Sequence, residues 1–493
     1  QLIDFDIIDI DNTTNVLNNG GLYSRRRIMG VLGEVQLQFR DFLFLTVNGR
    51  NDWSSTLPAQ NRSFFYPAVS GALIFTDALN IDNNFLTFGK LRAGWSKVGN
   101  DADPYLLNSV FDINPQFVAQ SVLFPFGGVP GTTLDDIATD PNLTPEFTRT
   151  VEAGTDLQFY NNRASLAVTV YESRTTNGIA PQSYPSTSGF LQFLTNFGTV
   201  ENKGIEVNAS LTPVSRPNGF RWELTGNFTH NRNVVKELAP GVEEIVVRNL
   251  FGGGIIPVLR PGAEYGVIRG SVDLRDEEGN LLIDPSNGQM IRSLQPGIIG
   301  NPNPDFFVGL SNTFSFKGIT LFALFDWRQG GDIYSTTLLS QLGRGVTKDT
   351  EDREINKIIP GVFGDVNTGQ PLFDAEGNKI PNNIQVEVND LYFGETFAVN
   401  SADEWNVFDG TVVRLREVSL GYSLPASLLS RTPFGSASIT LTGRNLWYHA
   451  PNAPAHSNFD PEQTTFGTSN ALGFDFDNPP STRRYGFNLR FTF

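Results

Sequence analysis

The sequence predicts an all-β protein, a transmembrane antiparallel up-and-down β-barrel, from three observations. Apolar and polar residues alternate with a period of two through much of the chain, as in strands that have one apolar face. The connections between these strands alternate between short and long. Phe and Gly are abundant, at 40 and 48 residues, while charged residues make up only 18% of the chain. Outer-membrane barrels combine these properties, because alternation disperses their apolar residues and their long loops lie on one side.

The composition excludes several other classes of protein. The 493 residues include 36 Lys and Arg against 52 Asp and Glu, a net charge of −16, with no Cys and three scattered His. The absence of Cys excludes disulfides, Cys-ligated zinc, iron–sulfur clusters and thiol nucleophiles. An acidic chain without a basic block is a poor nucleic-acid binder. No apolar run approaches the 18 or more residues of a spanning helix.

The alternation predicts about thirteen strands. At the end of the chain, apolar Tyr485, Phe487, Leu489, Phe491 and Phe493 alternate with small or polar residues. The segment Leu2–Ile10 is a further strand or part of a loop. The predicted strands span residues 29–39, 42–53, 64–76, 86–98, 147–160, 163–173, 201–213, 220–231, 305–316, 319–329, 411–424, 435–448 and 481–493.

The connections favour a membrane barrel over a soluble β-sandwich. Short connections such as Arg40-Asp41, Asn161-Asn162 and Lys317-Gly318 alternate with long ones. A sandwich has no reason to place a long loop after every second strand, whereas outer-membrane barrels have short periplasmic turns and long extracellular loops. We therefore expect five long extracellular loops, at about 99–146, 174–200, 232–304, 330–410 and 449–480.

The tryptophans provide an independent argument. Trp95, Trp327 and Trp447 lie late in strands that run outward, and Trp222 lies early in another, all on the apolar phase. They are therefore expected at two levels, as in an aromatic girdle at the two membrane interfaces. The alternative is that they are core residues of a soluble β-protein.

A series of motifs then resembles one family. In order along the chain stand GRNDWSSTLP (49–58), KLRAGWSKVGN (90–100), NFGTVENKGIEV (196–207), NPNPDFFVGLSNTFSFKG (301–318), RLREVSLGYSLP (414–425) and GRNLW (443–447). Together they resemble the SusC/RagA family of TonB-dependent outer-membrane transporters, and the resemblance covers nearly the whole chain.

The resemblance implies a fold larger than this chain. Family members resemble a 22-stranded barrel preceded by a plug domain. We therefore expect residues 1–493 to be a single, partial β-barrel domain, the C-terminal 13–14 strands, with the plug and the first barrel strands missing. The aromatic pattern from Tyr485 to Phe493 resembles the C-terminal signal for barrel assembly. The alternative is a complete, passive, porin-like channel with Leu2–Ile10 as its fourteenth strand.

The resemblance also implies a function. We expect a nutrient importer in the outer membrane of a Gram-negative bacterium of the Bacteroidetes type, energised by the TonB complex through the missing N-terminal part. Its cargo would be oligosaccharides or peptides delivered by a SusD-like surface lipoprotein. The resemblance also suggests a dimer of two such transporter–lipoprotein pairs. Polar residues on the inner strand phase are expected to line its path, namely Arg92, Ser96, Asp326, Arg328, Arg414 and Arg416.

Chemistry other than transport has little support. No nucleotide-binding, metalloprotease or serine-hydrolase motif is present, so we predict no catalytic residue, no enzyme activity and no cofactor. The acidic pairs Asp101/Asp103 and Asp135/Asp136 leave Ca²⁺ binding on an extracellular loop open, with solvated loop charge as the alternative. DEEGN (276–280) and DAEGN (374–378) are predicted to be hairpin turns. Residues Ile333–Gly345 are predicted to contain a short extracellular helix.

Overall fold

A computed structural model describes most of the chain. The described residues are 24–107, 111–113, 129, 132–134, 137–217, 219–250, 254–393, 402–454, 457–467 and 469–493. The predicted segment Leu2–Ile10, the pair Asp135/Asp136 and His456 lie outside them.

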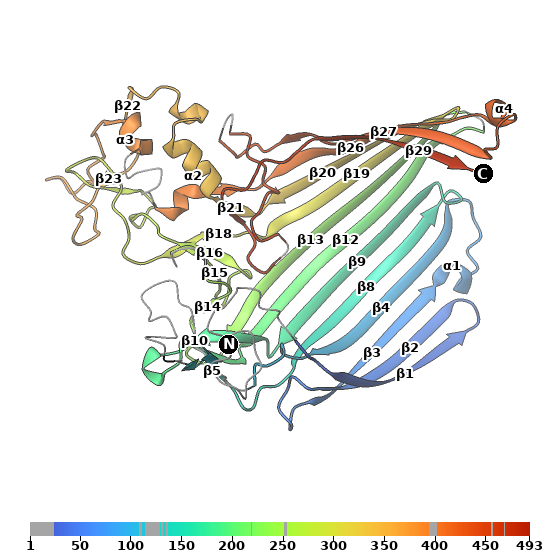
Figure 1. The fold of residues 1–493 in the computed structure, drawn as a ribbon, viewed down its shortest axis with the longest axis horizontal. Coiled ribbons are helices and arrows are strands. Elements are labelled where there is room, and N and C mark those ends of the chain that lie inside the picture. The colour runs from blue at the N-terminus through green and yellow to red at the C-terminus, as the bar shows by residue number, and fades with distance from the viewer. Residues whose placement is uncertain are drawn as a thin grey trace.

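One large antiparallel sheet of thirteen strands dominates the structure (Figure 1). Each strand pairs with its neighbours in chain order, as an up-and-down topology requires. The long, tilted strands form a curved surface with most of the remaining chain gathered at one end (Figure 1). The strands are β1 (Ile28–Phe39), β2 (Leu43–Ser54), β3 (Ser63–Ile74), β4 (Leu86–Asn100), β8 (Glu146–Phe159), β9 (Ala164–Thr176), β12 (Gly198–Ser215), β13 (Arg221–Leu238), β19 (Pro304–Phe316), β20 (Ile319–Gly330), β26 (Val412–Ser423), β27 (Ser436–His449) and β29 (Arg484–Thr492).

The all-β prediction is confirmed, and each of the thirteen predicted strands corresponds to one strand of this sheet. The largest differences are at β12 and β13, which run several residues further toward the long connections than predicted. The register there continues through charged pairs such as Lys203 opposite Arg232. Alternation of apolar and polar residues stops where strands leave an apolar environment, but backbone pairing does not have to stop there.

The two outer strands of the sheet are β1 and β29. Among the described strands, these two do not pair with each other, so the described residues do not form a closed barrel. The alternative of a closed fourteen-stranded channel depends on Leu2–Ile10, which lies outside the described residues.

The short connections are tight turns. In the β8–β9 turn, Asn161 and Asn162 have φ values of 54° and 66°, and in the β19–β20 turn Lys317 and Gly318 have 46° and 83°. Two consecutive residues with positive φ match the twist of paired antiparallel strands, which explains the Asn and Gly at these positions.

The long connections fold into small sheets of their own, which the sequence analysis did not predict. Their strands are β5 (Phe111–Ile113), β6 (Thr132–Leu134), β7 (Ile137–Thr139), β10 (Ile179–Ser183), β11 (Gln192–Asn196), β14 (Ile245–Val246), β15 (Ile256–Leu259), β16 (Val267–Gly270), β17 (Leu282–Ile283), β18 (Gly297–Gly300), β21 (Asp332–Ser335), β22 (Asn356–Lys357), β23 (Val362–Phe363), β24 (Val386–Glu387), β25 (Val407–Asp409) and β28 (Phe474–Asp475). Each of these strands has only two to five residues, too few for alternation to identify it.

The α-helices are short: α1 (Phe75–Ala78), α2 (Thr336–Gly343), α3 (Val388–Phe393) and α4 (Ala426–Leu429). Helix α2 confirms the helix predicted within residues 333–345. The Ser335 side chain caps it by accepting a hydrogen bond from the Leu338 backbone, and Leu338 and Leu342 are buried. In the described part of the chain, no helix has the length and apolarity needed to cross a membrane.

The turns predicted at DEEGN and DAEGN are also confirmed. Asp276 accepts hydrogen bonds from the backbones of Glu278 and Asn280, and Asp374 does the same for Glu376 and Asn378. The glycine of each turn has a φ of 84–87°. Backbone hydrogen bonds to the Asp374 carboxylate lower its pKa, and a bond from Lys379 lowers that of Asp276 to about 2.

Candidate functional site

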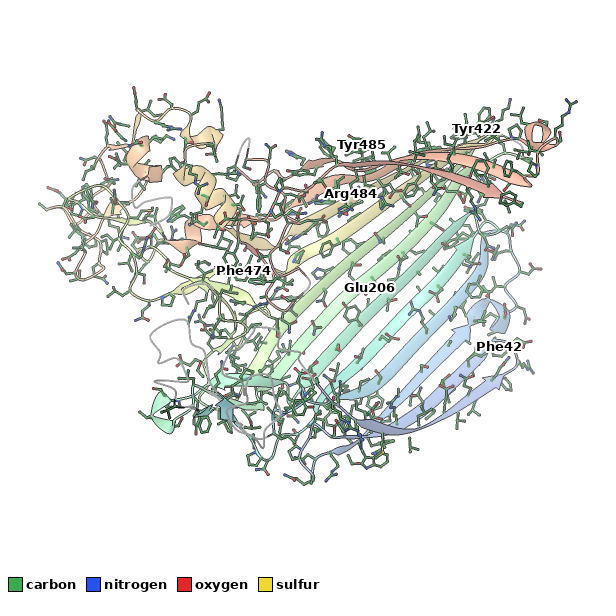
Figure 2. All side chains as sticks on the ribbon, viewed as in Figure 1. Phe42, Glu206, Tyr422, Phe474, Arg484 and Tyr485 are labelled. Atoms are coloured by element: carbon green, nitrogen blue, oxygen red, sulfur yellow. The ribbon has the colours of Figure 1, made fainter. Side chains whose placement is uncertain are left out.

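The large sheet has one apolar and one polar face. Residues paired across neighbouring strands share a face, so the register assigns the faces directly. Val69, Trp95 and Val151 form one row on the apolar face, while their neighbours Ala68, Ser96 and Thr150 form a row on the polar face. All six residues predicted to line a path lie on the polar face. Figure 2 labels another polar-face residue, Glu206, in the middle of the sheet.

The polar face carries a dense group of charges where β20 and β26 approach the long connections. We call it the arginine cluster. It consists of Asp326, Arg328, Arg414, Arg416, Asp460 and Glu462.

Arg414 is the buried centre of the arginine cluster. Its side chain and that of Asp460 are each only 2% exposed, and the two form a two-pronged ion pair, with 3.0 Å between Arg414 Nη1 and Asp460 Oδ2. Burial pushes the pKa of the Asp460 carboxyl upward, but hydrogen bonds from Arg414, Ser481 and the Glu462 backbone hold it below its ordinary value. Asp460 is therefore an anion throughout the physiological pH range.

Arg416 and Arg328 complete the arginine cluster. Arg416 lies at a β-bulge, and its Nε is 2.8 Å from Asp326 Oδ2 while its Nη1 is 2.7 Å from Glu462 Oε2. Arg328 donates to the carbonyl oxygens of Gly331 and Pro461, at 3.1 and 3.4 Å. Three arginines of the sheet thus hold residues 460–462 of one long connection against the polar face.

The other two predicted path residues are not part of the arginine cluster. Arg92 donates to Thr169 Oγ1 at 2.6 Å and lies 3.6 Å from Asp156. A Cβ at Gly154 would lie 2.9 Å from the Arg92 guanidinium carbon, so this glycine leaves room for the side chain. Ser96 lies on the same strand, beside Ala68 and Thr150. The sequence thus placed all six residues on the polar face, but it did not show that four of them form the arginine cluster.

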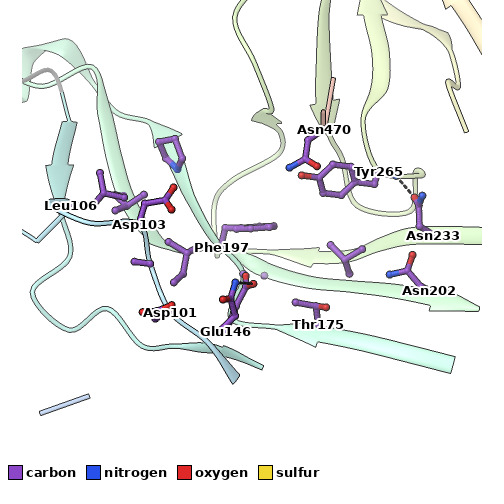
Figure 3. Close-up of a pocket in the computed structure, with 18 residues that line it drawn as sticks. Asp101, Asp103, Leu106, Glu146, Thr175, Phe197, Asn202, Asn233, Tyr265 and Asn470 are labelled. Atoms are coloured by element: carbon purple, nitrogen blue, oxygen red, sulfur yellow. Dashed lines mark hydrogen bonds between the residues drawn. The ribbon is translucent and has the colours of Figure 1, made fainter. Parts of the chain in front are cut away.

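The long connections and the adjoining strand ends line an open cavity of about 680 Å³ (Figure 3). Its walls combine acidic, amide and aromatic side chains, and the described lining contains no Lys or Arg. These include Asp101, Asp103, Glu146, Asn100, Asn202, Asn233, Asn470, Phe197 and Tyr265. Such a surface suits uncharged or cationic groups with many hydrogen-bonding atoms.

Two groups in this wall are already engaged by the protein. Asp101 accepts hydrogen bonds from Arg26, Ser54 and Thr56. Burial pushes the pKa of Asp101 upward, but these three donors outweigh it and lower the pKa. Tyr265 donates its backbone N–H to Asn233 Oδ1 at 2.5 Å, and burial raises the pKa of its hydroxyl.

The four predicted girdle tryptophans all lie on the apolar face. Trp327 and Trp447 lie near the long connections and are 39% and 49% exposed, and Trp95 lies at the same end of β4. Trp222 lies at the opposite end, stacked on Phe314, with its Nε1 3.2 Å from Asn312 Oδ1. The five aromatic and apolar residues at the end of the chain are all exposed, and Phe491 and Phe493 contact Phe434.

The partners of the predicted residues could not be identified from alternation. Asp460 and Glu462, the partners of Arg414 and Arg416, lie in a long connection with no alternation. The cavity residues Tyr265, Asn233 and Asn470 come from three distant segments. One available signal was the group of three arginines on the polar face of β20 and β26, which needs carboxylates nearby. As for metals, no group of three or more His, Asp or Glu side chains converges among the described residues.

Comparison with known proteins gives one family. The model of the TonB dependent receptor-like β-barrel family matches residues 3–258, more than half of the chain. A TonB-dependent receptor of Formosa agariphila is 28% identical over 98% of this chain and 48% of its own length. The TonB-dependent receptor SusC of Bacteroides thetaiotaomicron is 24% identical over 81% of this chain and 38% of its own. The chain spans about half the length of the curated relatives it matches, or less.

Solved structures agree on the fold. The structure of the RagAB peptide transporter matches 97% of this chain and 50% of its own, with a TM-score of 0.69 and 17% identity. The same importer in its open–open state matches with a TM-score of 0.66. The resemblance to the SusC/RagA type is thus confirmed in sequence and in fold.

Proposed function

We infer the function from one premise: this chain belongs to the family of TonB dependent receptor-like β-barrels, which are outer-membrane proteins. We propose that the complete protein is a TonB-dependent importer rather than an enzyme. In this proposal the thirteen strands form part of a larger, 22-stranded barrel with a plug in its lumen. The apolar face of the sheet contacts lipid, and the polar face lines the lumen.

The observation that carries the proposal is the charge on the polar face. Arg92, Asp326 and the arginines of the arginine cluster lie on that face, as do Glu417 and Arg444, which form an ion pair at 3.0 Å. Charges at membrane depth are stable when they face a water-filled or protein-filled interior. A lumen that admits hydrated nutrients, with a plug to close it, provides that interior.

We propose oligosaccharides or peptides as the cargo, delivered by a SusD-like lipoprotein that covers the long connections. The cavity among these connections supports this class, because its amide, carboxylate and aromatic groups suit hydroxyl-rich or peptide-like ligands. It disfavours strongly anionic cargo, since its described lining has three acids and no Lys or Arg. The relatives also support a complex with TonB, and a dimer of transporter–lipoprotein pairs belongs to the same proposal.

Uptake in cells tests the importer. The complete gene and its neighbouring lipoprotein gene are expressed in a Gram-negative host, and fluorescent neutral oligosaccharides and peptides are followed. We expect uptake of one class, which deletion of tonB abolishes. The porin-like alternative instead predicts uptake that persists without TonB and a steady conductance of the purified protein in planar bilayers. That result would refute the importer.

A further inference from the structure

The apolar face carries a row of basic residues on three neighbouring strands. Lys97 of β4 pairs with Arg149 of β8, and Arg149 pairs with Arg174 of β9. We call these three residues the basic row. Like charges directly opposite one another destabilise a sheet, so the basic row has a cost that its neighbours must offset.

The described residues offset this cost only weakly. The Arg149 side chain is exposed and makes no hydrogen bond or ion pair with any described residue. Lys97 lies 3.8 Å from the centre of the Phe147 ring, a contact that does not neutralise its charge. Arg174 has one carboxylate at 3.9 Å, that of Glu237, and both side chains are at least half exposed. Glu201 lies opposite Arg174 on β12, but its carboxylate pairs with Lys203 and Lys236, at 3.3 and 3.1 Å. The basic row therefore presents positive charge outward.

The basic row lies at a defined level of the membrane. Trp95 and Val151 begin the adjacent row on the side away from the long connections, and the ion pair of Glu172 and Lys203 continues it on β9 and β12. The next row away from the long connections contains Ala93, Ala153 and Val170. Tryptophan marks the interface between hydrocarbon and headgroups. The basic row, one step further out, is consequently level with the headgroups of the outer leaflet.

A hollow of about 470 Å³ joins the basic row to the apolar surface. Arg149 and Arg174 stand on its outer side, and Val151 and Val170 form an apolar wall. Glu172 and Lys203, which form an ion pair with each other, lie beside them. The two valines are 46% and 48% exposed. The valine wall thus suits an acyl chain and the arginine side suits an anion. An anionic lipid combines both groups.

We propose that the basic row binds the phosphate-bearing headgroup of a lipid in the outer leaflet, with an acyl chain of that lipid against Val151 and Val170. A phosphate between Arg149 and Arg174 accepts hydrogen bonds from both guanidinium groups and removes their repulsion. Neighbouring Lys203 is already paired with Glu172 and Glu201, each at 3.3 Å, so the three residues of the basic row carry the uncompensated charge. The proposal concerns the lipid-facing surface and is independent of the cargo.

Native mass spectrometry of the complete protein in a neutral detergent tests the lipid site. The probe is diphosphoryl lipid A, compared with the same lipid after removal of its phosphates and with inorganic phosphate alone. We expect stable binding of the phosphorylated lipid, at least tenfold weaker binding of the dephosphorylated lipid, and no stable adduct with inorganic phosphate. The triple variant Lys97→Gln, Arg149→Gln, Arg174→Gln is expected to weaken lipid A binding about a hundredfold, at about fivefold per residue.

A matched control separates this site from general charge. Arg40→Gln, Lys317→Gln and Arg431→Gln remove the same residue types at the opposite end of the sheet, in the short connections. This control triple is expected to leave binding within twofold, and a charge-preserving triple (Lys97→Arg, Arg149→Lys, Arg174→Lys) to retain most of it. The proposal is overturned if the two lipids bind equally, or if the two neutralising triples weaken binding equally. It is also overturned if an acidic protein partner, in place of lipid, is found bound to the basic row.

Discussion

The arginine cluster and the basic row lie on opposite faces of the same sheet, and each contains three basic residues. The two groups differ in whether these residues have partners within the protein. In the arginine cluster, Arg414 and Arg416 meet carboxylates, and Arg328 meets two carbonyl oxygens. In the basic row the cations face one another. A charge held within the protein needs a partner in the protein, whereas a charge left without one indicates a partner outside it. The comparison predicts that substitutions in the two groups have effects of different size and sign.

The largest effect is expected from Arg414→Leu. The change leaves the Asp460 carboxylate, 2% exposed, without its main partner, and breaking a buried ion pair typically costs about 3–5 kcal/mol. We expect the temperature of unfolding in detergent to fall and residues 457–467 to become sensitive to protease. Arg431→Leu, in an exposed short connection, is the control.

The double variant Arg414→Leu, Asp460→Leu sharpens this prediction. It removes the uncompensated charge together with its partner, so we expect it to recover more than half of the lost stability. If the single Arg414 variant unfolds like the unchanged protein, the arginine cluster does not hold the long connection.

The next effect is on pH dependence. Asp460 and Asp101 have pKa values in the folded protein below those of the unfolded chain. Their stabilisation is complete above the unfolded value of about 3.9 and is lost as the pH falls through the lower folded values. We expect the unfolding temperature to be flat from pH 7 to about 5 and to drop below about 4. In Asp460→Asn, part of this drop should disappear, and an unchanged pH profile would contradict the assignment.

Arg92→Gln is expected to have a smaller effect, because its charge is half-exposed. Arg92 and Asp156 are 34% and 30% exposed and 3.6 Å apart, and exposed pairs of this kind contribute about 1 kcal/mol or less. We expect little change in unfolding temperature. If the polar face lines the lumen, however, uptake of cargo should change although stability does not. Ser96→Ala, on the same strand and without a charge, is the matched control.

The sequence was sufficient for the sheet because alternation and connection length act over whole strands. It assigned Trp95, Arg92 and Arg414 to the correct faces, since a period of two determines the face of every residue in a strand. It did not reveal Asp460 as the partner of Arg414. Arg414 and Asp460 are 46 residues apart in the sequence, and Asp460 lies in a connection without alternation. A contact of this kind depends on how the connection folds back onto the sheet, not on a local sequence pattern.

The basic row is a second feature that alternation in the sequence could not reveal. Alternation alone did not single out Lys97, Arg149 or Arg174. Their significance depends on register, which aligns the three across strands β4, β8 and β9. A shift of one residue in any of these strands would turn its side chain to the other face. Register became visible only with the strands paired in space.

The smallest effect, and the one that separates the two groups most clearly, is expected from Arg149→Gln. In a neutral detergent without phosphorylated lipid, the change removes repulsion from Lys97 and Arg174, so stability should rise by a few tenths of a kcal/mol. With diphosphoryl lipid A present, the unchanged protein gains stability from the bound lipid and the variant gains less, so the sign of the difference should reverse. Arg414→Leu should be destabilising in both conditions, because its partner belongs to the protein. The unfolding temperatures of the unchanged protein and the two variants, with and without lipid A, measure these stability differences. If the difference between Arg149→Gln and the unchanged protein keeps its sign when lipid A is added, no lipid phosphate compensates the basic row.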